Sequence, residues 1–223
     1  MKKLLMCMLL FAITGTACAQ DNTSLAFVSE FVRELGTIEK IRATGEQELK
    51  EKGSNPFANS IRNSTRVQLE LRASIEMLSG MHLKPPVDGI PQGIIDVYKE
   101  KIKLHQKSID IASQFMAGQK QNVDYGKLAA EMPKITASLE YVDETLFKVT
   151  PAVFGSLIDM KADSHGHANH LVITKAERQE LIHDIKTSFG SKLSAKNQNY
   201  TVSAASVLLS GLQKDFKCSD EPW

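Results

Sequence analysis

The sequence predicts an all-α protein: an antiparallel bundle of four long helices, followed by about three shorter helices at the C-terminal end. Apolar residues recur at steps of three and four along most of the chain, which places them on one side of an α-helix. Alternating apolar and polar residues, which would indicate half-buried strands, are absent, and residues 171–173 form the only β-like run. The four long segments have similar lengths and short connections, which favours antiparallel neighbours.

The first long helix is expected between residues 21 and 52, where polar residues at 21–24 can cap its start. Gly36 and Gly45 lie inside it, and each should weaken the helix by about 1 kcal/mol relative to alanine. Its apolar stripe consists of Leu25, Val28, Val32, Leu35, Ile38 and Ile41.

A proline-rich loop is expected between the second helix and the third. The second helix should start with Asn55 as N-cap and Pro56 in the first helical position, and should run to about residue 81. Residues 84–93 contain three prolines and two glycines, so we expect an ordered loop there rather than a helix. The third helix is expected at residues 94–117, with the stripe Ile95, Tyr98, Ile102, His105, Ile109, Ala112 and Met116.

The fourth long helix is expected at residues 125–149. Its stripe consists of Leu128, Met132, Ile135, Leu139, Val142, Leu146 and Val149. Thr150 and Pro151 then repeat the pattern of a cap followed by proline, and so predict a separate short helix that ends near residue 161.

Two further helices are expected in the last fifty residues. Thr174 and Glu177 have the spacing of a capping box, in which each side chain accepts a hydrogen bond from the other residue's backbone N–H. The helix behind this box should bury Leu181, Ile182, Ile185 and Phe189. The last helix should bury Val202, Ala205, Leu209, Leu212 and Phe216. Residues 217–223 are expected to be a frayed tail.

Residues 1–19 have the pattern of a secretory signal peptide. Two lysines precede an apolar run of ten residues, which is too short to span a bilayer as a helix. Ala17-Cys18-Ala19 fits a small-x-small cleavage site, so the mature chain should start at Gln20. The protein is therefore expected to be exported, either periplasmic or secreted. An alternative is a lipoprotein anchored through Cys18, although Gly15 stands where lipoprotein signals usually carry leucine.

The mature chain, residues 20–223, is expected to form a single all-helical domain with no transmembrane span. A sub-division near residue 150 is an alternative, but no linker composition marks it. The formal charge falls from +1 to −1 when the two lysines of the signal are removed, and basic and acidic residues are interspersed, so nucleic-acid binding is not expected. Cys218 is the one cysteine left after cleavage, either a tolerated tail thiol or a residue that pairs between chains.

Four of the six histidines lie within nineteen residues: His165, His167, His170 and His183. Neutral imidazole is the commonest protein ligand for Zn, Ni and Cu, and three donors on a glycine-containing loop could converge on one ion. The spacing matches no stereotyped metal motif, since neither His-Glu-x-x-His nor Cys-x-x-Cys occurs. The alternative interpretation is a solvated loop whose histidines bind nothing specific.

The remaining polar residues of the helices favour a structural interpretation. His105 lies on an apolar stripe, which is typical of a core histidine bonded to a neighbour, with a b-type haem ligand as the alternative. Glu140, Asp143 and Glu144 are expected to form a solvated helix face. Hydrolase and phosphate-binding motifs are absent, which favours a non-catalytic protein, with an enzyme of unfamiliar design as the alternative.

The sequence as a whole predicts an exported, non-catalytic helical protein that binds a macromolecular partner, most simply another envelope protein, in an immunity-type or accessory role. The alternative is a periplasmic transition-metal-binding protein that uses the histidine loop at residues 165–170. The two predictions differ in the part of the protein that binds. Helix faces would bind a macromolecule in the first, and imidazole groups would bind a metal ion in the second.

Overall fold

The computed structural model describes residues 23–83, 88–118, 124–158, 173–196, 198–214, 218 and 220. Within these residues the structure is all-helical and contains no strand, so the predicted all-α class is confirmed. The elements are α2 (Thr23–Lys50), α3 (Pro56–Ser79), α4 (Ile90–Ala117), α5 (Tyr125–Ile158), α6 (Lys175–Phe189), the 3-10 helix η1 (Gly190–Ser194) and α7 (Tyr200–Gln213). The predicted signal peptide lies outside the described residues, and none of the described helices is long and apolar enough to cross a membrane.

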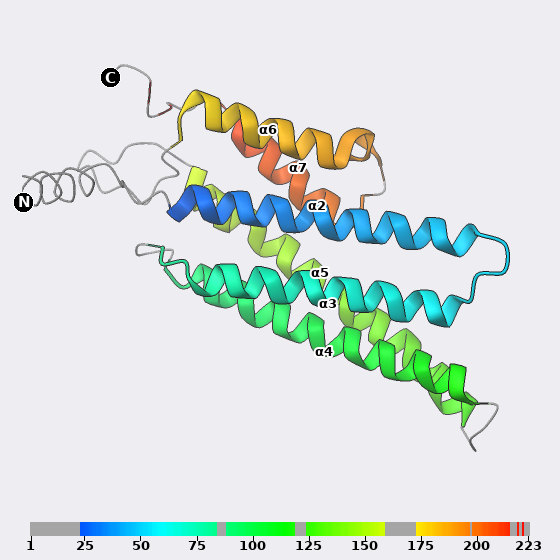
Figure 1. Cartoon of the computed structure of the whole chain (residues 1–223). Helices are drawn as coiled ribbons and strands as arrows, with labels where there is room; N and C mark the ends of the chain where they lie inside the picture. The colour runs from blue at the N-terminus through cyan, green and yellow to red at the C-terminus, as the bar shows by residue number, and fades with distance from the viewer. Residues whose placement is uncertain are drawn as a thin grey trace, which may run out of the picture.

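Five of the helices form a ring (Figure 1). α2, α3, α4 and α5 pack side by side in sequence order, and α7 packs against both α5 and α2. α6 lies outside this ring, against α2 and α7. The arrangement therefore differs from a simple bundle of four long helices, because the short helix α7 is a main neighbour of α5.

The main hydrophobic core lies at one end of this ring and continues between the ring and α6. It is built by the first half of α2, the second half of α3, the first turns of α4, and by α6 and α7. Its most deeply buried side chains include Phe27, Val28, Leu71, Tyr98, Ile173, Ile185, Leu208 and Leu212. The second half of α2 and the first half of α3 contribute few residues to this core, so the opposite end of the ring is the part of the fold with room for a ligand.

Local sequence signals placed two helix starts correctly. The side chain of Asn55 accepts hydrogen bonds from the backbone N–H groups of Phe57 and Ala58, with Pro56 in the first turn. Both hydrogen bonds of the capping box between Thr174 and Glu177 are present. The four residues predicted to be buried on α6 are buried: Leu181, Ile182, Ile185 and Phe189.

Two predicted helix boundaries are wrong, both at prolines. α4 starts at Ile90, because Pro91 occupies the first turn, where a helix loses no backbone hydrogen bond to proline. α5 continues through Pro151 to Ile158 instead of breaking at Thr150. The Thr150 hydroxyl donates to the carbonyl of Leu146, one turn earlier, so it does not cap a new helix. Packing of α5 against α4 and α7 offsets the one backbone hydrogen bond that Pro151 cannot make.

The buried face of α4 is rotated from the predicted stripe. Lys101, Leu104 and Ser108 are buried, whereas His105 is partly buried and Met116 is half exposed. The reason is that α4 packs against both α3 and α5, and the face between two neighbours is wider than one stripe.

The predicted frayed tail is wrong where the structure describes it. Cys218 is buried, and the side chain of Asp220 accepts a hydrogen bond from the backbone N–H of Lys175 at the start of α6. A carboxylate is favourable there because the first N–H groups of a helix have no partner inside the helix.

Candidate binding cleft

A cleft of about 920 Å3 lies inside the ring, at the end that the core does not fill. Its walls come from one face of the second half of α2, one face of the first half of α3, Lys101 and His105 of α4, three residues of α5, and residues 198–201 at the start of α7. The three residues of α5 are Leu139, Glu140 and Asp143. Its volume lies within the range of about 300–1,000 Å3 that ligand sites usually occupy. We refer to it below as the cleft.

Small polar side chains on α3 leave this space open. The lining of α3 includes Asn59, Ser60, Asn63 and Ser64, whereas the second half of the helix buries Leu71 and Leu78. Asn59 is fully buried between the helices and donates to the backbone carbonyl of Gly45, 3.0 Å away. These side chains hold α2 and α3 close together without filling the interior of the ring.

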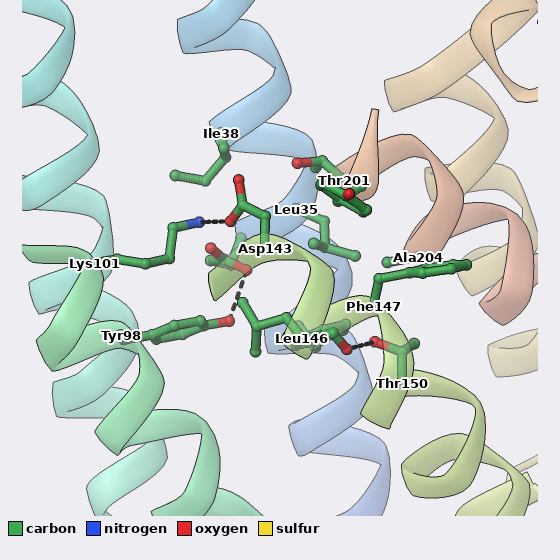
Figure 2. A pocket seen from close by; sticks show the side chains of 13 residues that line it. Leu35, Ile38, Tyr98, Lys101, Asp143, Leu146, Phe147, Thr150, Thr201 and Ala204 are labelled. Atoms are coloured by element: carbon green, nitrogen blue, oxygen red, sulfur yellow. Dashed lines mark hydrogen bonds and ion pairs between the residues drawn. The ribbon is translucent and has the colours of Figure 1, made fainter. Parts of the chain in front are cut away.

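An ion pair between buried Lys101 and partly exposed Asp143 forms the floor of the cleft. The ammonium of Lys101 lies 2.7 Å from Oδ1 of Asp143, and Figure 2 shows the two side chains pointing toward each other from α4 and α5. Lys101 is only 6% exposed, so its charge depends on this partner. The other oxygen of Asp143 points away from Lys101 (Figure 2).

Beneath this ion pair lies a small chamber of about 20 Å3, enough for one water molecule. Its lining includes Glu34, Tyr98 and Thr150, and it shares Lys101 and Asp143 with the cleft. The hydroxyl of Tyr98 donates to Oε2 of Glu34 across 2.8 Å. The chamber therefore continues the polar floor of the cleft toward the core.

Burial controls the charge of Glu34. It raises the pKa of this carboxyl to about 7, although the charge of Lys101 and the hydrogen bond from Tyr98 both act in the opposite direction. When Glu34 is ionised, Glu34 and Asp143 are two carboxylates beside one ammonium, that of Lys101. The floor of the cleft then carries an excess negative charge.

His105 lines the cleft as a neutral imidazole. Its Nδ1 lies 3.3 Å from the hydroxyl oxygen of Ser64 on α3. Burial, and next the charge of Lys101, lower the pKa of His105 to about 4. The predicted hydrogen bond to a neighbour is confirmed.

A second ionic network holds the start of α7 in place. Glu39 is buried and accepts hydrogen bonds from Arg42, Lys192 and Asn199. Burial alone would raise the pKa of Glu39, but these hydrogen bonds outweigh it and lower the pKa to about 2. Asn199 is also the N-cap of α7, so this network positions the α7 wall of the cleft against α2.

The predicted metal ligands do not belong to this cleft. His165, His167 and His170 lie outside the described residues, and the structure does not test them. His183 is exposed on α6, outside the ring, with Nε2 3.4 Å from the hydroxyl oxygen of Thr187. In the described part of the chain, no group of three or more His, Cys, Asp or Glu side chains is arranged to hold a metal ion.

The prediction of a solvated acidic face on α5 is wrong for Asp143. That residue pairs with buried Lys101, and Glu140, one turn before it, also lines the cleft. Glu140 and Glu144 fit the prediction, since Glu140 is exposed and Glu144 pairs with exposed Lys148. The sequence gives no sign that Lys101 and Glu34 belong to a site, because a single charged residue near an apolar stripe usually extends to solvent.

Comparison with protein-family models, with curated proteins and with solved structures finds no match to this chain. The geometry and charge of the cleft are therefore the basis for a functional proposal.

Proposed function

We propose that this protein is an exported, non-catalytic helical protein that binds another macromolecule of the cell envelope, and that a segment of this partner occupies the cleft. The observation that carries the proposal is the cleft itself, whose volume of about 920 Å3 has room for several amino-acid side chains. Export is inferred from the signal-like sequence of residues 1–19.

The lining of the cleft suits a polypeptide segment. Apolar side chains such as Ile41, Leu49 and Leu139 alternate with amides and hydroxyls, which can exchange hydrogen bonds with a peptide backbone. Tyr200 and Thr201 line the cleft, and their side-chain hydroxyls have no hydrogen-bonding partner among the described residues. A bound segment would supply those partners.

A catalytic role has weaker support. Ser64 and His105 are in contact, but a histidine whose conjugate acid has a pKa of about 4 is a weak general base at neutral pH. Among the described residues, no carboxylate hydrogen-bonds to the other ring nitrogen of His105, as the third member of a triad would.

Site-specific photo-crosslinking in the source cells tests the proposal. A photoreactive amino acid at Leu139, on the cleft wall, should form an adduct with one defined partner protein. The control is the same substitution at Tyr141, two residues further along α5, which is 69% exposed and does not line the cleft. Equal adducts at both positions, or none at Leu139, would contradict the proposal.

Metal binding by His165, His167 and His170 is the second candidate function, and the density of histidines in the sequence is the observation that favours it. It is independent of the cleft, and its test is among the predictions below.

A further inference from the structure

We infer that the partner segment carries a lysine or arginine, whose charged group lies against Glu140 and Asp143 and whose stem lies along the apolar wall of the cleft. This inference rests on the proposed function, since it names the chemistry of the segment that the cleft would hold. Four observations support it: the charge of the lining, the engagement of its cations, the position of two carboxylates on α5, and the shape of the wall.

The cleft lining contains more negatively charged groups than positively charged ones. Two cations, Arg42 and Lys101, face three carboxylates, Glu46, Glu140 and Asp143. His105 adds no positive charge near neutral pH, because burial lowers its pKa to about 4. The cleft is therefore complementary to a cation.

Both cations of the lining are already engaged. Arg42 pairs with Glu39 and with Glu46, and Lys101 pairs with Asp143. An anionic ligand would have to compete with these carboxylates for the same cations. A cationic ligand would break no existing pair.

Two carboxylates are available to a cation on the α5 side. Glu140 is exposed and forms no ion pair with any described residue. Asp143 lies one turn later on the same helix face, and its second oxygen points away from Lys101 (Figure 2). A single ammonium or guanidinium could therefore contact both residues.

The walls suit a long apolar stem that ends in a charge. Ile41, Leu49 and Leu139 line the cleft beside the carboxylates, and the aliphatic stems of lysine and arginine pack on such surfaces while their charged ends remain solvated. Tyr200 also lines the cleft, and the face of its ring could contact a cation. A small inorganic cation would use the carboxylates but not these walls.

Peptide selection on the full mature chain tests the inference. Random twelve-residue peptides displayed on phage would be selected against the immobilised protein at low salt and sequenced. We expect enrichment of lysine or arginine at one position, flanked by apolar residues. We also expect binding of the selected peptides to weaken as the salt concentration rises.

A matched pair of variants locates the binding site. Glu140→Lys should weaken binding of the selected peptides by at least about tenfold, because it places like charges together in the cleft. Glu144→Lys makes the same change in net charge at a residue of α5 that does not line the cleft and pairs with Lys148, and it should change the affinity by less than about twofold. Both glutamates lie on the surface of α5, and circular dichroism would verify that both variants are folded.

The outcomes separate this inference from the proposed function. Peptides that bind in the cleft without a basic residue would overturn the inference and leave the proposed function intact. Equal weakening by Glu140→Lys and Glu144→Lys would show attraction to net charge alone, and would also overturn it. Selection that yields no cleft-binding peptide, together with no adduct at Leu139, would overturn both.

Discussion

The carboxylate of Glu39 on α2 accepts a hydrogen bond of 2.6 Å from the ammonium of Lys192 in η1, 153 residues later in the chain. The same carboxylate accepts a hydrogen bond from Asn199, the N-cap of α7. One buried side chain thus joins α2 to the start of α7. Because residues 198–201 line the cleft, the shape of the candidate site depends on this contact.

Replacement of Glu39 by glutamine should lower the free energy of unfolding by about 2–3 kcal/mol, because it removes hydrogen bonds to a charged group. The control, Glu100→Gln, removes an exposed ion pair to Lys103 and should change the free energy of unfolding by less than about 1 kcal/mol. Urea denaturation at pH 7 measures the free energy of unfolding of both variants. The pKa of Glu39 is lowered from 4.5 to about 2, so its contribution should be lost as the pH falls from 4.5 through about 2. Equal effects of the two variants at pH 7 would contradict this prediction.

Glu34 should have the opposite dependence on pH. Folding raises its pKa from 4.5 to about 7, so the folded state binds this proton more tightly than the unfolded state does. Its contribution to stability is fully present below pH 4.5 and is lost as the pH rises through about 7. Thermal unfolding of wild type and Glu34→Gln should show the wild type losing stability relative to the variant over this window. A difference that is constant between pH 4.5 and 7 would show that Glu34 titrates normally.

Replacement of Gly45 by alanine should destabilise the protein, although alanine normally stabilises a helix relative to glycine. A Cβ at this position would overlap the side-chain amide of Asn63 on α3, which donates to Asn59. We expect Gly45→Ala to destabilise the fold instead of stabilising it by the usual increment of about 1 kcal/mol. Adding Asn63→Ala to this variant should recover part of the loss, since it removes the clash. A Gly45→Ala variant that is more stable than wild type in urea denaturation would refute the close approach of α2 and α3.

Cys218 should react slowly with thiol reagents in the folded protein. Its side chain is buried, whereas the sequence placed it in a frayed tail that could pair between chains. The rate of reaction with a chromogenic disulfide should therefore rise by orders of magnitude on unfolding in urea. Rapid reaction under native conditions, or a disulfide-linked dimer of the purified protein, would contradict the burial of this thiol.

Titration with Zn, Ni and Cu tests the second candidate function. If the histidine loop binds a metal, calorimetry at neutral pH should show micromolar affinity in wild type and none in a variant with His165, His167 and His170 changed to alanine. Binding should weaken as the pH falls through about 6.5, because the ligand is the neutral imidazole. Equal weak binding by the two proteins would show that these three histidines hold no metal.

The elements that the sequence predicted correctly depend on contacts within a few residues. The capping box of Thr174 and Glu177 and the N-cap at Asn55 form between residues two to three positions apart. The buried face of α6 follows from helical periodicity, because only one side of this short helix meets the ring. For these features the sequence pattern and the final environment agree.

The cleft was not predictable in this way, because its residues are brought together by tertiary packing. Glu34, Lys101 and Asp143 come from three helices, and neither the burial of Lys101 nor its pairing with Asp143 has a local signature. These charges face inward because of the helices that pack against α4 and α5.

The sequence by itself determined the helical class, the caps and the apolar face of α6, because each follows from the periodicity and the local hydrogen bonding of the chain. Tertiary structure alone decided that α5 runs through Pro151, that α7 packs between α5 and α2, and that one end of the ring holds a cleft. The physical reason is that packing energy between helices exceeds the cost of one missing backbone hydrogen bond or one buried ion pair, and that energy depends on which helices meet.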